Sequence, residues 1–255
     1  MLIKQFLTYF FGSILSILGL LLFDPINLFL LSLLFLNTLG YIIVLTVIAK
    51  IRHNTNNKEQ TQKVDGSTPP LVSFIIPAYN EETTIERKLE NTFNLNYLSN
   101  ALEVIVVDDG STDKTSSILK TLQQTRFPKL KIIRQDRKGK SAAENAGLRE
   151  SKGDIIVISD ADVPLNPNAL QFMVEDFKNP KVGGVTCAIK ANEKYVLALN
   201  LDIASYTRKL ENKIDSIFGM SGPFVAFRKS IISTIDEGIF SSDTDLGILV
   251  RRKGF

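Results

Sequence analysis

The chain of 255 residues has no tryptophan, one cysteine and one histidine. His53 lies in a polar stretch near the N-terminus, so a Ser-His-Asp triad, a Cys-His pair and a His-rich metal centre are all excluded from the rest of the chain. Cys187 has no partner for an internal disulfide, which suits a reducing compartment. It sits in an apolar run, where we expect an ordinary core thiol.

Glycine-based nucleotide motifs are also missing. The sequence contains neither a G-x-G-x-x-G dinucleotide fingerprint nor a G-x-S-x-G nucleophile elbow. Residues 139–141 (Gly-Lys-Ser) imitate the end of a P-loop, but that pattern needs glycine at position 134, which is Arg134. The net charge is only +3, and no basic stripe is present. Nucleic acid is therefore not a predicted partner.

Charged residues are absent from two long N-terminal runs, residues 5–23 and 26–49. Each run matches the roughly 20 residues that cross a bilayer core of about 30 Å. Only Asp24 and Pro25 separate them. The pattern predicts a transmembrane hairpin over residues 1–50, with the lipid bilayer as a partner. A cleaved signal peptide is disfavoured because its apolar region is shorter, at about 7 to 15 residues.

The charges that flank these runs predict the orientation of the hairpin. Lys4 precedes the first run and Lys50 follows the second, whereas the connecting turn carries only Asp24. The positive-inside rule then puts both ends in the cytoplasm. We expect a two-pass protein of the cell membrane with its catalytic domain on the cytoplasmic side.

Residues 51–70 form a polar linker that ends in two prolines, and residues 71–255 form the predicted domain. Asn80 is expected to cap its first helix, and Asn166 with Pro167 to open a later one. Apolar strands alternate with amphipathic helices, which predicts an α/β fold with a doubly wound, mostly parallel sheet. The expected strands cover 71–76, 102–107, 130–133, 155–158 and 182–189, and 193–216 is expected to be helical.

Four short acidic segments stand out, at residues 77–81, 107–111, 159–162 and 242–245. The first three follow predicted strands, and open α/β sheets bind ligands at the carboxyl ends of their strands. In the third segment, Asp160 and Asp162 form a D-x-D pair. Their oxygen ligands favour Mg²⁺ or Mn²⁺ over zinc. The alternative is a solvated turn whose acids cap a helix.

The other segments carry groups that suit a nucleotide. Tyr79, at a strand end, could stack on a base. The adjacent acids Asp108 and Asp109 need donors, which a base N–H, backbone N–H groups or an Asx turn could supply. Lys140, at the start of a helix, could meet a diphosphate, although an exposed basic turn is an equally good reading of this segment. Glu81 could simply be a first-turn helix acid.

Taken together, these segments resemble the family-2 glycosyltransferases with the GT-A fold. The membrane hairpin and residues 221–228 make the chain most similar to the poly-N-acetylglucosamine or cellulose synthase-like group. The resemblance covers residues 71–255 and rests on six segments in the family's order. They are residues 76–81, 106–113, 139–147, 159–162, 221–224 and 243–246.

The resemblance implies an inverting transfer of sugar from a UDP-sugar donor to a hydroxyl of a carbohydrate or lipid-linked acceptor. It makes Asp160 and Asp162 the ligands of Mg²⁺ or Mn²⁺. It makes Asp243 the general base, with Asp245 as the second candidate, since the family's Glu-Asp pair is Ser242-Asp243 here. The implied nucleotide-sugar-binding residues are Pro77, Ala78, Tyr79, Glu81, Asp108, Asp109, Lys140 and Asp160.

Two alternatives remain open at the level of function. The family's polymerising membrane enzymes carry a Q-x-x-R-W motif after the base, whereas this sequence ends at residues 251–255 without one. We therefore expect either a fragment or a shorter enzyme that makes one transfer. A catalytically silent, membrane-anchored subunit that binds a nucleotide sugar or a partner enzyme is the second reading. A nucleotidyltransferase is less favoured because residues 77–81 lack a glycine-rich basic loop.

Overall fold

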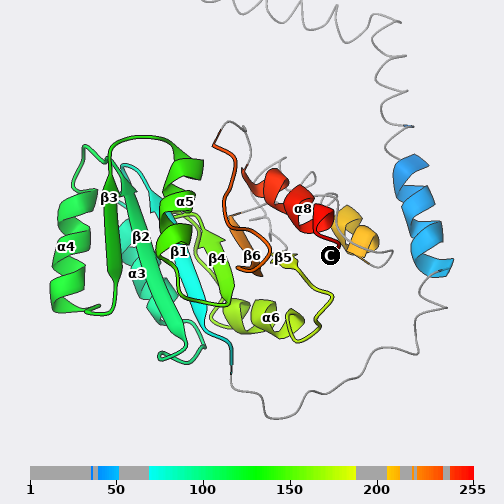
Figure 1. Ribbon diagram of the computed structural model, residues 1–255, viewed down its shortest axis with the longest axis horizontal. Helices are drawn as coiled ribbons and strands as arrows, with labels where there is room; N and C mark the ends of the chain where they lie inside the picture. The colour runs from blue at the N-terminus through cyan, green and yellow to red at the C-terminus, as the bar shows by residue number, and fades with distance from the viewer. Residues whose placement is uncertain are drawn as a thin grey trace, which may run out of the picture. The chain divides into compact units, whose positions relative to one another are not determined.

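The computed structural model describes residues 36, 40–51, 69–187, 206–212, 220, 223–237 and 242–255 (Figure 1). The chain divides into two compact units. One comprises residues 1–60 and 206–216, and the other comprises residues 61–205 and 217–255.

In the first unit, residues 40–51 and 206–212 are helical. The Tyr41 hydroxyl donates a hydrogen bond of 2.9 Å to Glu211 Oε1. None of the helices within the described residues is long and apolar enough to cross a bilayer. The predicted span 5–23, and most of the predicted span 26–49, lie outside the described residues.

The second unit is built on a six-stranded sheet with the order β3-β2-β1-β4-β6-β5 (Figure 1). Strands β1 to β4 are mutually parallel, and β6 is antiparallel to both β4 and β5. The predicted mostly parallel α/β sheet is thus confirmed. The strands are β1 (Val72–Ala78), β2 (Leu102–Asp109), β3 (Lys131–Gln135), β4 (Ile155–Ser159), β5 (Gly184–Thr186) and β6 (Phe224–Arg228).

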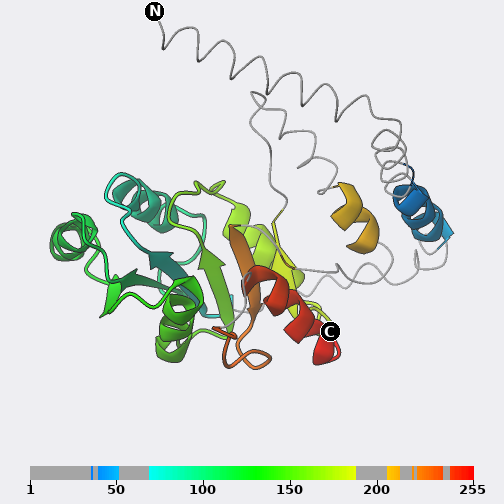
Figure 2. The same cartoon turned by 90° about the horizontal axis from the view of Figure 1, so that it is seen from above.

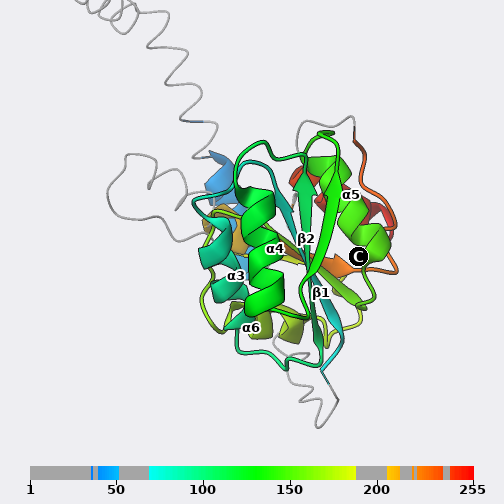
Figure 3. The ribbon, with the colours of Figure 1, turned by 90° about the vertical axis from the view of Figure 1, so that its left-hand side faces the viewer.

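Helices cover both faces of the sheet because successive residues of each buried strand point to opposite sides. Figure 3 shows α3 and α4 on one side of β1 and β2, and α5 on the other. Phe74 and Ile76 of β1 pack in the core that includes α3, α4 and α6, whereas Ile75 packs in the core with α5 and α8. The helices are α3 (Ile85–Phe93), α4 (Thr115–Thr125), α5 (Lys140–Glu150), α6 (Ala169–Asp176) and α8 (Ser242–Arg252).

The last helix adds to the second of these cores. Leu246 and Val250 of α8 pack with Val225 and Phe227 of β6. Figure 2 shows α8, in red, beside β6, in orange. This contact brings the helix that contains the predicted base onto the same face of the sheet as α5. Residues 242–244 are described only in their backbone, so the side chain of Asp243 lies outside the description.

The chain order of the strands indicates the edge of the sheet at which a ligand crevice is expected. The chain runs outward from β1 to β2 and β3, then returns to place β4 on the other side of β1. The strand order therefore reverses between β1 and β4, and such switch points form crevices at the carboxyl ends of the strands. The segments that follow β1, β2 and β4 all leave the sheet at this edge.

Two predicted helix starts are wrong. Asn80 does not cap the first helix, since α3 begins at Ile85 with Thr84 in the cap position. Asn80 instead adopts a left-handed backbone, with φ of 57°, and its side chain bonds to the neighbouring loop. The later helix, α6, begins at Ala169 rather than at Pro167, because residues 166–168 form a turn in which Asn166 Oδ1 accepts the Asn168 N–H.

Candidate functional site

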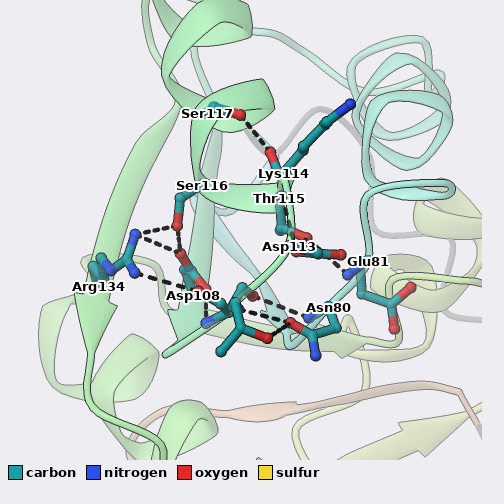
Figure 4. Close-up of polar contacts among 11 residues, drawn as sticks. Asn80, Glu81, Asp108, Asp113, Lys114, Thr115, Ser116, Ser117 and Arg134 are labelled. Atoms are coloured by element: carbon teal, nitrogen blue, oxygen red, sulfur yellow. Dashed lines mark hydrogen bonds and ion pairs between the residues drawn. The ribbon is translucent and has the colours of Figure 1, made fainter.

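The two loops at the carboxyl ends of β1 and β2 are joined by hydrogen bonds that run in both directions (Figure 4). The Asn80 N–H donates to Ser111 Oγ over 3.0 Å, and the Thr112 N–H donates to Asn80 Oδ1 over 2.8 Å. The Glu81 N–H donates to Thr115 Oγ1 over 2.8 Å. Because each loop supplies both donors and acceptors, the two loops form one rigid rim.

Asp108 serves the internal structure of this rim. Its carboxylate is buried, and Oδ1 accepts the Ser111 N–H over 2.9 Å, which is the Asx turn considered from the sequence. Oδ2 accepts the Ser116 hydroxyl and lies 3.6 Å from the Arg134 guanidinium (Figure 4). These contacts account for the carboxylate without a ligand, so the predicted role of Asp108 in binding a nucleotide sugar has no support from its geometry.

Asp109 reaches across to the loop between β3 and α5. Its side chain is only 2 % exposed and accepts four hydrogen bonds. Oδ1 accepts from Gln135 Nε2 at 2.7 Å and from the Lys138 N–H at 2.9 Å. Oδ2 accepts from Arg137 at 2.5 Å and from the Gly139 N–H at 2.8 Å. This one carboxylate therefore organises residues 135–139.

The pKa of Asp109 reflects this arrangement. Burial alone would raise it, but the hydrogen bonds from Gln135, the backbone of residues 138 and 139, and Arg137 outweigh burial and hold the pKa below its ordinary value of 3.8. The carboxylate is consequently ionised at neutral pH. It can accept a hydrogen bond, and it cannot donate one.

Gly110 allows the loop after β2 to approach residues 135–139 this closely. Its φ is 74°, and a Cβ at this position would lie 2.7 Å from the Arg137 backbone nitrogen. Any other residue would both strain the backbone and push the 135–139 loop away. The hydrogen bonds between Asp109 and residues 135–139 therefore require glycine at position 110.

Tyr79 lies against the same loop. The Arg137 guanidinium carbon is 3.6 Å from the centre of its ring, which is a close cation–π contact. Tyr79 is 37 % exposed and Arg137 is 51 % exposed, so both can meet a ligand from solvent. The structure thus brings together Tyr79 and Asp109, two predicted site residues, and joins them through Arg137.

The same loop leads to the D-x-D segment. Gly139 has φ of 101° and precedes α5, which begins at Lys140 as the sequence predicted. The Lys140 ammonium lies 2.6 Å from Asp160 Oδ1 and 4.0 Å from the buried Glu144. Asp160 directly follows β4, and its N–H donates to the Pro223 carbonyl over 3.0 Å. The structure therefore brings together Lys140 and Asp160, two predicted site residues.

Asp160 and Asp162 carry carboxylate oxygens, the ligand type that a hard divalent cation prefers. Asp162 is exposed and Asp160 is half-buried, so both are accessible from the crevice edge. In the part of the chain that the structure describes, no cluster of three or more His, Cys, Asp or Glu residues is present. A diphosphate would have to supply further oxygen ligands, as is usual for Mg²⁺.

The remaining predicted residues are placed as follows. Pro77 and Ala78 end β1 beside Val107 and Asp108, and the Ala78 side chain is buried in the core. Glu81 is half-buried, and its carboxylate accepts the Thr84 hydroxyl. None of these observations identifies a ligand for Pro77, Ala78 or Glu81. Asp245, the second candidate for the base, is half-buried on α8.

A buried lysine behind the D-x-D segment was not predicted. Lys88 of α3 is 3 % exposed, and its ammonium donates to Ser159 Oγ and to the Val163 carbonyl, both over 2.7 Å. It therefore holds Ser159 and Val163, the residues on either side of Asp160–Asp162. The signal was in the sequence, since position 88 lies three residues after Ile85 and one before Leu89, on the buried face of an amphipathic helix.

Burial lowers the pKa of Lys88 to about 8, although the charges of Asp160 and Asp162 oppose this shift. The amine still carries its proton in most molecules at pH 7. The acidic segment thus has one ammonium behind it, from Lys88, and another at its edge, from Lys140.

We expect the pH dependence of stability to reveal this lysine. Between pH 8 and 10.5 the unfolded chain holds more protons at this site than the folded chain, so the free energy of unfolding contributed by Lys88 rises with pH. The rise is roughly 2 to 3 kcal/mol. It should be absent in Lys88→Met when urea unfolding is followed by circular dichroism at both pH values. Lys120→Met, which removes an exposed lysine of α4, should retain the rise. An unchanged profile in Lys88→Met would contradict the assignment.

Comparison with known proteins agrees with this geometry. Residues 73–236 match the model of glycosyl transferase family 2. The chain is 28% identical over 193 residues to a poly-beta-1,6-N-acetyl-D-glucosamine synthase of Staphylococcus epidermidis, covering 73% of this chain and 44% of that protein. It is 32% identical over 200 residues to the probable glycosyltransferase YdaM of Bacillus subtilis, covering 73% and 48%. The chain thus spans about half the length of the curated relatives it matches.

Solved structures give the same result for the fold. A mannosyltransferase from Pyrobaculum calidifontis, in complex with GDP-Man and Mn²⁺, superposes with a TM-score of 0.73 at 27% identity, covering 88% of this chain and 63% of that one. TarS of S. aureus superposes with a TM-score of 0.53 at 20% identity, covering 70% and 52%, a likeness of fold. The family model covers more than half of the chain and includes the crevice residues from Tyr79 to Asp162, so this chain belongs to glycosyl transferase family 2.

Proposed function

We propose that the chain binds a nucleotide sugar and transfers the sugar, with inversion, to a hydroxyl acceptor. One observation carries this proposal. Residues 135–140 connect the Tyr79–Asp109 pair, which suits a planar base, to the Lys140–Asp160 pair, which suits a diphosphate and its cation. A base and a diphosphate are joined covalently in the donor, and this loop spans the two matching places.

The relatives support a nucleotide-sugar donor. The mannosyltransferase that shares the fold at 27% identity was solved with GDP-Man and Mn²⁺. The curated relatives named as poly-beta-1,6-N-acetyl-D-glucosamine synthases support a carbohydrate acceptor. A lipid-linked acceptor rests on the sequence resemblance alone. We infer a uridine rather than a guanosine donor from the acceptor capacity of Asp109, which is developed below.

Asp160 and Asp162 would hold the divalent cation, Mg²⁺ or Mn²⁺. When bound, the cation offsets the negative charge that grows on the departing diphosphate. Lys140 contributes to the same end, because an ammonium at the first turn of α5 adds its charge to the helix dipole. Such fixed charges commonly supply several kcal/mol of transition-state stabilisation.

Asp243 is the proposed general base. The acceptor oxygen attacks the anomeric carbon while its proton passes to the Asp243 carboxylate, and the bond from that carbon to the diphosphate oxygen breaks. The backbone of α8 packs beside β6, next to the strand that leads to Asp160, which is compatible with this role. A base in this position contributes about 10²- to 10⁴-fold to the rate.

We also propose that the N-terminal residues 1–50 anchor the chain in the cell membrane, with the catalytic unit in the cytoplasm. The proposal rests on the uncharged runs and on the lysines that flank them. The helix at 40–51, which covers the last ten residues of the second run and the two residues after it, exposes apolar side chains. They are Tyr41, Ile43, Val44, Val47, Ile48 and Ile51.

The primary test is a screen of UDP- and GDP-sugars with isolated membranes that contain the full chain, reading the nucleoside diphosphate released. Release that depends on added Mn²⁺ and on an acceptor supports transfer. Binding of a nucleotide sugar with neither transfer nor hydrolysis would favour the silent anchored subunit. Absence of both binding and release would overturn the proposal.

Asp162→Asn should remove the metal-dependent part of UDP binding, because an amide is a much poorer ligand for a hard cation than a carboxylate. Calorimetric titration of UDP with and without Mn²⁺ measures this difference. Asp154→Asn makes the same change in charge at the opposite end of β4 and should behave as wild type. Wild-type enhancement by Mn²⁺ in Asp162→Asn would refute the metal role.

Asp243→Asn should lower the rate of transfer by about 10²- to 10⁴-fold and leave the affinity for UDP unchanged. The split between rate and affinity is expected because the base acts on the acceptor proton rather than on the donor. Asp245→Asn is the matched variant, two residues further along α8, and should retain transfer. If Asp245→Asn is the inactive variant, the base is Asp245 and the present assignment is wrong.

The anchored chain should resist extraction by alkaline carbonate. In inverted membrane vesicles the catalytic unit should be open to added protease, whereas in right-side-out vesicles it should be protected. The control is a periplasmic or external marker protein with the opposite pattern. Release of the full chain by carbonate would refute the anchor, and protection in inverted vesicles would refute the cytoplasmic orientation.

A further inference from the structure

Arg137 lies between Tyr79 and Asp109, the two residues that the proposed function assigns to the base. Its guanidinium is planar, lies 3.6 Å from the centre of the Tyr79 ring, and donates to Asp109 Oδ2 over 2.5 Å. Stacking on an aromatic ring while donating to a carboxylate is also what a nucleobase would do there. The side chain comes from the exposed part of the loop between β3 and α5.

The acceptor sites of Asp109 are full while Arg137 is in this position. A carboxylate oxygen accepts about two hydrogen bonds, and each oxygen of Asp109 already accepts two. A new donor can therefore enter only if one of the present four leaves. Two of these are backbone N–H groups of the loop. Of the two side-chain donors, only Arg137 also covers the Tyr79 ring, so its departure alone frees both an acceptor site and a face for stacking.

We propose that Arg137 is an internal placeholder for the donor base, which must swing out before a nucleotide can bind. This inference rests on the proposed function. Departure of the Arg137 side chain frees one face of Tyr79 and a single acceptor site on Oδ2 of Asp109. The fraction of molecules with Arg137 outside the site then sets the apparent affinity for nucleotide, since the apparent Kd is the intrinsic Kd divided by that fraction.

The single freed site also selects the base. Uracil presents one imide N–H on its pairing edge, which Oδ2 can accept. Guanine presents two neighbouring donors on that edge, and the second would face Oδ1, which remains filled by Gln135 and the Lys138 N–H. A buried donor without an acceptor is costly, so the site prefers a uridine nucleotide.

The decisive variant is Arg137→Met, which keeps an unbranched apolar chain and removes the guanidinium. Calorimetric titration should show UDP binding about tenfold more tightly than to the wild type, because a close cation–π contact and a charge-assisted hydrogen bond no longer compete. Lys138→Met is the matched control. It removes the same charge from the same loop but keeps the backbone N–H that Asp109 accepts, and it should bind UDP no more tightly than the wild type.

Two results would overturn the proposal. If Arg137→Met binds UDP as weakly as Lys138→Met, or more weakly than the wild type, then Arg137 supports the nucleotide rather than competing with it. If GDP gains as much affinity as UDP and binds equally well, then the single acceptor site does not select the base.

Chemical rescue provides a test that does not require a nucleotide. In Arg137→Ala, methylguanidinium should bind between Tyr79 and Asp109, raise the melting temperature and weaken UDP binding competitively. Methylammonium at the same concentration should do neither, and the wild type should respond to neither cation. If no variant binds UDP or GDP, the donor proposal fails, and the placeholder is judged by the melting temperatures alone. An equal response to the two cations would then overturn it.

Discussion

The carboxylate of Asp109 is the contact on which the crevice depends. It ends a buried strand, and through four hydrogen bonds it fixes the loop that carries Arg137 and leads to Lys140. An ionised group this deeply buried would be costly without such partners, and its lowered pKa shows that they more than compensate. Without this charge, the loop would lose the contact that directs Lys140 toward Asp160.

A second set of charges surrounds the acidic segment after β4. Lys140 meets Asp160 at the edge of the crevice, while Lys88 supports the residues on either side of the segment from within the core. Two carboxylates one residue apart repel each other, and the two ammonium groups reduce this repulsion in the free protein. The segment can therefore keep a defined shape before any cation or diphosphate arrives.

The sequence predicted the features that depend on neighbouring residues. The apolar runs gave the parallel strands, and the acids after β1, β2 and β4 were correctly expected at one edge because parallel strands share a direction. The Asx turn of Asp108 was one of the alternatives that the sequence offered, because its partner Ser111 is only three residues away. The features that were missed depend on residues far apart. Asn80 bonds to Thr112, and Arg137 meets Tyr79, through contacts that no local pattern encodes. The antiparallel strand β6 was likewise not expected, because a short apolar run does not reveal its direction.

The reciprocal hydrogen bonds between the loops after β1 and β2 have a consequence for how such a site can change. Asn80 and Glu82 each bond to residues of the second loop in both directions, through Ser111, Thr112, Asp113 and Lys114. A substitution on one side leaves a donor or acceptor unmatched on the other. These two loops therefore have to be inherited, or transplanted into another enzyme, as a single cassette.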